Sequence, residues 1–226
     1  MSMDLELIDK HLLSGFVPVF IILVLFFTVL HMRGKGQTFA HIIISFVFCF
    51  YLVGVLTMTG IWYLGSYSPN IVYVPFADMI RGPVDTALNI LLFVPFGVFL
   101  PLLFQEYDRI WKVALIGFLI SLSIEFVQMF ECGSTDINDL ITNTVGACLG
   151  FLVYKLLLRV IPESRMIAVR LRGISSIFEL LVFFVFSLVI MVTIQPVLFH
   201  TLFDSNLRNG EIHAWNSCVV RIVELM

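Results

Sequence analysis

The sequence has little charge. Of its 226 residues only 13% are Asp, Glu, Lys or Arg, whereas 60% are hydrophobic and 23 are phenylalanine. The mean hydropathy is +1.03, well outside the range of soluble globular domains. A chain this poor in charge cannot cover a soluble domain with polar groups. We therefore expect an integral membrane protein, with no nucleic acid among its partners.

Cysteine is also scarce and carries no motif. The four cysteines, Cys49, Cys132, Cys148 and Cys218, show neither disulfide nor metal-ligand spacing, so we interpret them as small hydrophobic residues. Repeats and low-complexity segments are absent as well. One membrane domain accounts for nearly the whole chain.

Six apolar runs are long enough to cross about 30 Å of hydrocarbon as helices. They cover residues 12–30, 39–59, 84–104, 111–130, 137–158 and 174–199. The first run is too long for a cleaved signal peptide and lacks a small-residue cleavage pattern, so we expect it to stay as a helix. The predicted fold class is all-α, a polytopic transmembrane helical bundle of about six spans.

Basic residues predict the orientation. If the N-terminus is outside, nine of the 13 Lys and Arg residues lie in inner segments and four lie outside, which favours an N-out/C-out arrangement. We divide the chain into an N-terminal segment with the first helix (1–38), a membrane core (39–158), and a third part (159–226). The third part holds a cytoplasmic basic loop, the sixth helix and an outer tail.

Polar residues concentrate between residues 121 and 143, within otherwise apolar segments. Asp136, Asp139 and Asn143, followed by Gly146 and Gly150, are spaced by 3, 4, 3 and 4 residues, so all five share one face of the fifth helix. That face is polar at its outer end and small deeper down.

Two neighbouring helices carry similar stripes. Glu125 and Gln128 are three residues apart on the fourth helix, and Asp85 and Asn89 are four apart on the third. A charge at bilayer depth costs on the order of 2.5 to 3.5 kcal/mol, so Glu125 should face the bundle interior and find partners.

Structural roles compete with functional ones at several of these positions. Asp136 follows Ser134 and Thr135 at a helix start, where an N-cap needs no further function. Asn89 and Asn143 could bond each other across helices. Gly146 and Gly150 favour close helix packing over ligand contact. Glu125 has no capping role and is our strongest functional candidate.

Four segments resemble the VanZ-like family of bacterial membrane proteins. They read N-x-x-x-V-P-F at 70–76, N-I-L-L-F-V-P-F-G at 89–97, I-E-F-V-Q at 124–128 and D-I-N-D-L-I-T-N-T-V-G at 136–146. The resemblance covers about residues 40–158 and implies a multi-pass protein of the bacterial plasma membrane. The family is named for a protein linked to resistance against teicoplanin, a glycopeptide antibiotic with a lipid tail.

This chain departs from the family pattern at one point. Many members have an arginine shortly before the aspartates, where this chain has Gly133, Ser134 and Thr135. A cation would have to come from elsewhere, and Arg81 is our candidate. The candidate ligand-binding residues are Arg81, Asp85, Asn89, Glu125, Gln128, Asp136, Asp139 and Asn143.

Three classes of function fit such an outward-facing acidic cluster. We rank first a non-enzymatic envelope protein whose partner is a membrane lipid, a lipid-linked envelope precursor or a lipoglycopeptide antibiotic, with no cofactor. Second is a membrane enzyme acting on a lipid phosphate or ester through the Glu/Asp cluster, with Mg²⁺ or with acid and base groups. Third is a proton-coupled transporter that uses Glu125 as a relay.

Overall fold

Six long helices dominate the structure, a computed structural model that describes residues 5–61, 70–72, 82–130, 134–160, 169–171 and 174–203. The helices are α1 (Leu5–Met32), α2 (Phe39–Met58), α4 (Pro83–Leu103), α5 (Ile110–Gln128), α6 (Ile137–Leu157) and α8 (Ile174–Phe203). Between them lie a 3-10 turn (Gln105–Tyr107) and two three-residue strands, β1 (Asn70–Val72) and β2 (Ser134–Asp136). All six helices are long and apolar enough to span a membrane.

The six predicted spans are therefore confirmed, and two of them are longer than predicted. α1 begins at Leu5 rather than at residue 12, and α8 continues to Phe203 rather than ending at residue 199. The local sequence determines where some of the helices begin. Thr38 caps α2 by accepting a hydrogen bond from the amide of His41 at 3.3 Å, and Pro83 occupies the first turn of α4, where its missing N–H costs nothing.

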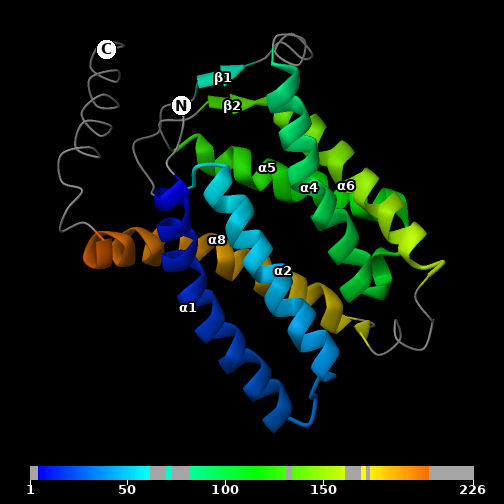
Figure 1. Cartoon of the computed structure of the whole chain (residues 1–226). Coiled ribbons are helices and arrows are strands. Elements are labelled where there is room, and N and C mark those ends of the chain that lie inside the picture. Colours follow the sequence, from blue (N-terminus) through cyan, green and yellow to red (C-terminus); the bar gives the residue numbers. More distant parts are fainter. Residues whose placement is uncertain are drawn as a thin grey trace.

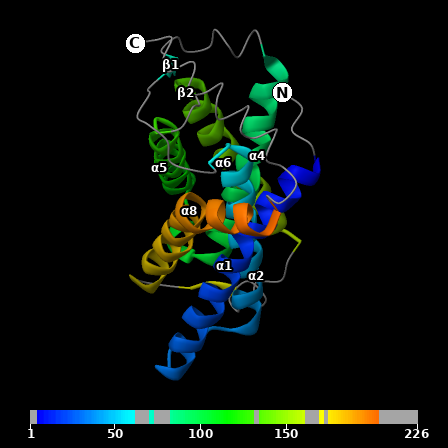
Figure 2. The same ribbon diagram turned by 90° about the vertical axis from the view of Figure 1, so that its left-hand side faces the viewer.

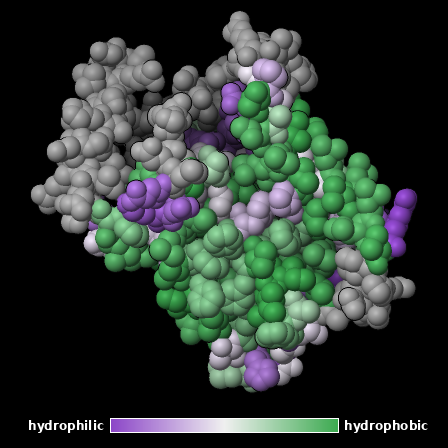
Figure 3. Space-filling view, in the orientation of Figure 1, coloured by the Kyte–Doolittle hydropathy of each residue, from purple (hydrophilic) through white to green (hydrophobic). Residues whose placement is uncertain are grey.

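The helices form two groups (Figure 1). α4, α5 and α6 pack together in one group, and α1, α2 and α8 in the other, while α2 also packs against α4. α8 crosses α1 and α2 steeply instead of running parallel to them. Large apolar side chains cover the face of the molecule seen in Figure 3, as expected where helices meet lipid.

The two strands mark one end of the α4–α5–α6 group, and we call it the strand end (Figure 2). β1 pairs with β2 in parallel, with Asn70 opposite Ser134 and Val72 opposite Asp136. Residues 70–72 form a strand against the start of α6, and residues 73–76 lie outside the described part of the chain.

α4 and α6 are held together by glycine. A Cβ atom added at Gly97 would collide with the carbonyl oxygen of Ala147, and one at Gly150 would collide with that of Val94. The two backbones can touch only because these side chains are absent. The packing role expected for Gly150 is confirmed, and Gly146 packs against the carbonyl oxygen of Ile90 in the same way.

Pro95 lies inside α4 and leaves the helix one amide donor short. Nearby, the hydroxyl of Tyr51 on α2 donates a hydrogen bond to the carbonyl oxygen of Leu92 at 2.7 Å. A side chain of a neighbouring helix thus bonds a backbone carbonyl one turn before the proline. This contact also joins the two helix groups.

The segment 169–171 joins the groups at the opposite end. The amide of Leu171 donates to the carbonyl oxygen of Leu103 at 2.8 Å, and the amide of Gln105 donates to that of Leu171 at 3.0 Å. These bonds attach the chain just before α8 to the end of α4. The segment is also bonded to α2, as described below.

Candidate functional site

Polar side chains from three helices meet near the strand end of the α4–α5–α6 group. α4 contributes Asn89, α5 contributes Ser121 and Glu125, and α6 contributes Asp139 and Asn143. We call these five residues the polar layer. Ser121, Glu125 and Asn143 are buried, and Asn89 and Asp139 are partly exposed.

Glu125 points into the protein and not toward lipid. Its side chain is 5% exposed, and its Oε2 atom accepts a hydrogen bond from the backbone amide of Asp136 at 3.0 Å. That amide lies at the start of α6, where the helix dipole favours a negative group. The carboxylate of Glu125 thus joins the end of α5 to the start of α6.

Asp136 performs the local role that the sequence suggested. Its carboxylate caps α6 by accepting from the backbone amide of Asn138 at 2.8 Å, and it also accepts from the side-chain amide of Asn138 at 2.8 Å. An N-cap of this kind contributes about 1 kcal/mol to helix stability. The expected capping function is therefore confirmed.

Hydrogen bonds within the polar layer connect residues on different helices. Asn89 donates from Nδ2 to the Oδ1 atom of Asp139 at 2.5 Å, and Asn143 donates from Nδ2 to the hydroxyl oxygen of Ser121 at 2.9 Å. The two asparagines do not bond each other, although the sequence left that open. Each one instead bonds a residue on another of the three helices.

The remaining candidates lie around the layer. Gln128 donates from Nε2 to the carbonyl oxygen of Thr59 at the end of α2, at 2.8 Å. Asp85 is exposed in the first turn of α4. Arg81 lies outside the described residues. The structure brings Asn89, Asp139 and the α5 residues together, and ligand binding by any of these residues stays a prediction.

Beneath the polar layer the helices pack backbone to backbone. Gly146 lies one turn below Asn143 and meets the carbonyl oxygen of Ile90. A Cβ at Gly117 of α5 would come within 2.8 Å of the Cβ of Ala147. This tight packing of small residues leaves little space between the three helices below the polar layer.

A second buried polar group lies at the opposite end of the molecule, and our sequence reasoning missed it. His41 of α2 and Glu179 of α8 are 1% and 2% exposed, with His41 Nε2 2.9 Å from Glu179 Oε2. The Nδ1 atom of His41 lies 2.6 Å from the carbonyl oxygen of Val169. Because a carbonyl only accepts, Nδ1 carries a proton and donates.

Gln37 completes this group by donating to Glu179 Oε1 at 3.2 Å. The group therefore joins α2, α8 and the segment 169–171. One sequence signal could have found it, because Glu179 is the single charged residue between residues 174 and 203. A lone charge inside an apolar span usually has a partner on another helix.

A third polar contact joins α1 to α8. His11 Nδ1 lies 2.6 Å from Gln195 Nε2, which also donates to the hydroxyl of Ser14 at 3.3 Å. The His11 ring stacks on Phe199 with a centroid separation of 3.9 Å. These contacts bury His11 and Ser14 of α1 against α8.

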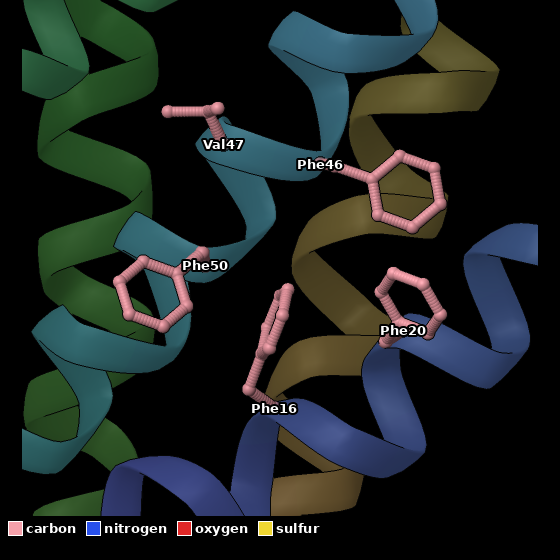
Figure 4. A pocket seen from close by; sticks show the side chains of 5 residues that line it. All are labelled: Phe16, Phe20, Phe46, Val47 and Phe50. Atoms are coloured by element: carbon pink, nitrogen blue, oxygen red, sulfur yellow. The ribbon is translucent and has the colours of Figure 1, made fainter. Parts of the chain in front are cut away.

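The groove between α1 and α2 is apolar (Figure 4). Phe16 and Phe20 of α1 face Phe46, Val47 and Phe50 of α2 around a hollow of about 270 Å³. No polar side chain lines it. The groove is thus distinct from the polar layer, and its walls suit hydrocarbon.

Metal ligands do not gather in the part of the chain that the structure describes. Among those residues no three His, Cys, Asp or Glu side chains lie close enough together to hold one ion. The carboxylates of the polar layer are instead engaged by amides of Asn89 and of the α6 start.

Comparison with known proteins identifies the family. A sequence model of the VanZ/LLP1 family matches residues 16–159. The chain belongs to the VanZ/LLP1 family. The match contains the whole polar layer and reaches into α1, beyond the residues 40–158 in which the sequence motifs lie. The protein is thus a multi-pass membrane protein of that family.

A curated relative supports this assignment over part of the chain. Protein VanZ of Enterococcus faecium is 44% identical over 69 residues. The aligned region is 30% of this chain, and the chain spans 42% of the length of that relative. No solved structure matches the chain significantly.

Proposed function

We propose that this VanZ/LLP1 family member binds a cell-envelope lipid or lipid-linked ligand at the polar layer, and that this binding contributes to tolerance of teicoplanin. One observation supports the proposal most strongly. Five polar side chains from three helices share one level near the strand end, and the helices pack tightly through glycine beneath them. An arrangement closed on one side suits a binding site reached from the membrane surface.

The second part of the proposal is the orientation of the protein in the membrane. Seven basic residues of the described chain lie at the end opposite the strands, namely Arg33, Lys35, Arg109, Lys112, Lys155, Arg159 and Arg170. At that end Lys155 pairs with Asp108 at 2.6 Å. By the positive-inside rule that end faces the cytoplasm, so the strand end faces outward and both termini are outside. In the bacterial plasma membrane the polar layer would then face the leaflet where lipid-linked wall precursors and lipoglycopeptides are found.

Other functions have less support. The alternative of a membrane enzyme needs a nucleophile or a metal ion, but the hydroxyl of Ser121 is engaged by Asn143, and the described residues group no three metal ligands. A transporter needs a path across the membrane. The contacts of Gly146 and Gly117 with neighbouring helices interrupt any polar path below Asn143.

Two conservative substitutions test the proposal in cells. Glu125→Gln and Asp139→Asn remove a charge and keep the size of the side chain, so both proteins should still insert and fold. In a teicoplanin-sensitive bacterium we expect the parent chain to raise the inhibitory concentration of teicoplanin more than that of vancomycin, which lacks the lipid tail. Both variants should lose that gain at equal membrane abundance.

Asp9→Asn is the matched control. Asp9 is exposed on α1, outside the polar layer, so the same chemical change there should leave tolerance unaltered. The proposal is wrong if the Glu125 and Asp139 variants accumulate normally and protect as well as the parent. The polar layer would then serve helix packing alone.

A further inference from the structure

Two buried amide oxygens, one in the polar layer and one beside it, have no hydrogen-bond partner. The side-chain amide nitrogens of Asn89, Asn143 and Gln128 each donate to an atom of the protein. Two amide oxygens, Oδ1 of Asn143 and Oε1 of Gln128, are buried without a hydrogen-bond partner. Each of the amide nitrogens still has a second N–H, so the notable feature is the two buried oxygens that are left unpaired.

The orientation of the Gln128 amide is fixed by its partner, whereas Asn143 faces the Ser121 hydroxyl, which can donate or accept, and in this structure the Asn143 nitrogen donates to it. Gln128 faces the carbonyl oxygen of Thr59, which only accepts, so its nitrogen must point there and its oxygen must be left over. Asn143 is 4% exposed and bonds Ser121, one turn from Asp139 on the same face of α6. A buried amide oxygen without a partner costs about 1 to 3 kcal/mol, so a ligand that donates to it would bind favourably.

The charges favour a cation as well. Asp136 and Asp139 lie at the start of α6, and Asp85 lies at the start of α4. Within the described chain none of these three carboxylates forms an ion pair with Lys, Arg or His. Carboxylates at this depth are stabilised by a positive partner.

An ammonium group fits these features better than a metal ion. It brings one positive charge and three N–H donors, enough to bond the Asp139 carboxylate and a neighbouring amide oxygen. A divalent ion would need several carboxylate or carbonyl ligands at 2.0 to 2.6 Å, and the described residues form no cluster of three metal-binding side chains. Asp139 and Asn89 are partly exposed, so an amine can reach them.

We propose that the polar layer recognises the protonated primary amine of a lipid or lipid-linked headgroup, with Asp139 as its ion-pair partner and Asn143 Oδ1 as an acceptor. This inference rests on the proposed function and names the chemistry of its ligand. The hydrocarbon part of such a ligand stays in the membrane, and the amine brings a positive charge and N–H donors to the layer.

Three phospholipids with different headgroups distinguish the effect of the positive charge from that of the N–H donors. Short-chain phosphatidylethanolamine carries both the charge and the N–H donors. Phosphatidylcholine keeps the charge and lacks the donors, and N-acetyl-phosphatidylethanolamine keeps one N–H and lacks the charge. We expect the full chain in detergent micelles to bind phosphatidylethanolamine at least tenfold more tightly than either analogue, measured by native mass spectrometry over a concentration series.

Variants connect this preference to the layer. Asp139→Asn should abolish the tenfold preference, Asp139→Glu should retain much of it because the carboxylate is kept, and Asp9→Asn should retain all of it. Soluble glycerophosphoethanolamine should compete weakly, because it lacks hydrocarbon. Competition as strong as that of the lipid would overturn the assignment to a lipid headgroup.

The outcomes separate this inference from the proposed function. If the full chain binds all three lipids saturably and equally, amine recognition is wrong while lipid binding stands. If none of the three lipids binds saturably, lipid binding at this layer is wrong, and amine recognition is wrong with it. A preference that survives in Asp139→Asn would place amine recognition outside the polar layer.

Discussion

At the scale of single residues, the largest energetic cost comes from ionisable side chains that are buried inside the protein. Glu179 and His41 are almost fully buried, and each keeps its place through a partner on another element. Glu125 has a similar position near the strand end, where a backbone amide faces its carboxylate. Such groups are costly to bury and far more costly to leave alone.

Removing one member of the His41–Glu179 pair should therefore destabilise the protein strongly. We expect Glu179→Ala to lower the free energy of unfolding by about 3 to 5 kcal/mol, because His41 and Gln37 lose their partner inside the protein. Thermal unfolding of the purified protein in detergent measures the change. Glu6→Ala breaks an exposed pair with Lys10 and should change stability little.

A double substitution distinguishes the pair from simple packing. Replacing both His41 and Glu179 by leucine removes both buried polar groups, so it should recover much of the stability lost in Glu179→Ala. If the stability changes of the two single leucine variants simply add in the double variant, the interpretation of a coupled pair is contradicted.

At the scale of elements, the contact between α4 and α6 positions the polar layer. Gly97, Gly146 and Gly150 let the two backbones meet, and this contact places Asn89 beside Asp139. Ser121 of α5 then lies where Asn143 can reach it. The site is thus a consequence of how closely three helices pack.

A single methyl group should disturb this contact. In Gly97→Ala the new Cβ would collide with the carbonyl oxygen of Ala147, which forces α4 away from α6 and should cost about 1 to 3 kcal/mol of stability. The control is Gly54→Ala in α2, where the nearest atom to a new Cβ is 3.9 Å away. We expect a lower melting temperature for Gly97→Ala and an unchanged or higher one for Gly54→Ala. Equal melting temperatures for the two variants would show that the α4–α6 contact is loose.

At the scale of the whole molecule, the orientation in the membrane decides which side the polar layer faces. With the four native cysteines replaced, a cysteine at Ser134 should react with an impermeant thiol reagent added to intact cells. A cysteine at Lys35, at the opposite end, should react only after lysis. The reverse pattern would overturn the outward-facing arrangement and the proposed access of envelope ligands.

Hydropathy and periodicity were sufficient to predict the elements. The helices start and end close to the predicted runs, because about 20 apolar residues are what a bilayer requires of a helix. The shared face of Asp139, Asn143, Gly146 and Gly150 followed from helical spacing alone. These properties depend on neighbours along the chain, so the sequence by itself determined them.

Only the tertiary structure decided which side chains bond to each other. Asn143 bonds Ser121 and not Asn89, and His41 meets Glu179 although 138 positions separate them. Such pairs depend on the rotation and separation of whole helices, which are set by backbone contacts such as that of Gly97 with Ala147. The pairing of residues 70–72 with 134–136 has the same origin. A pattern read along one helix specifies which face is polar, but only the packed bundle specifies which side chain meets it.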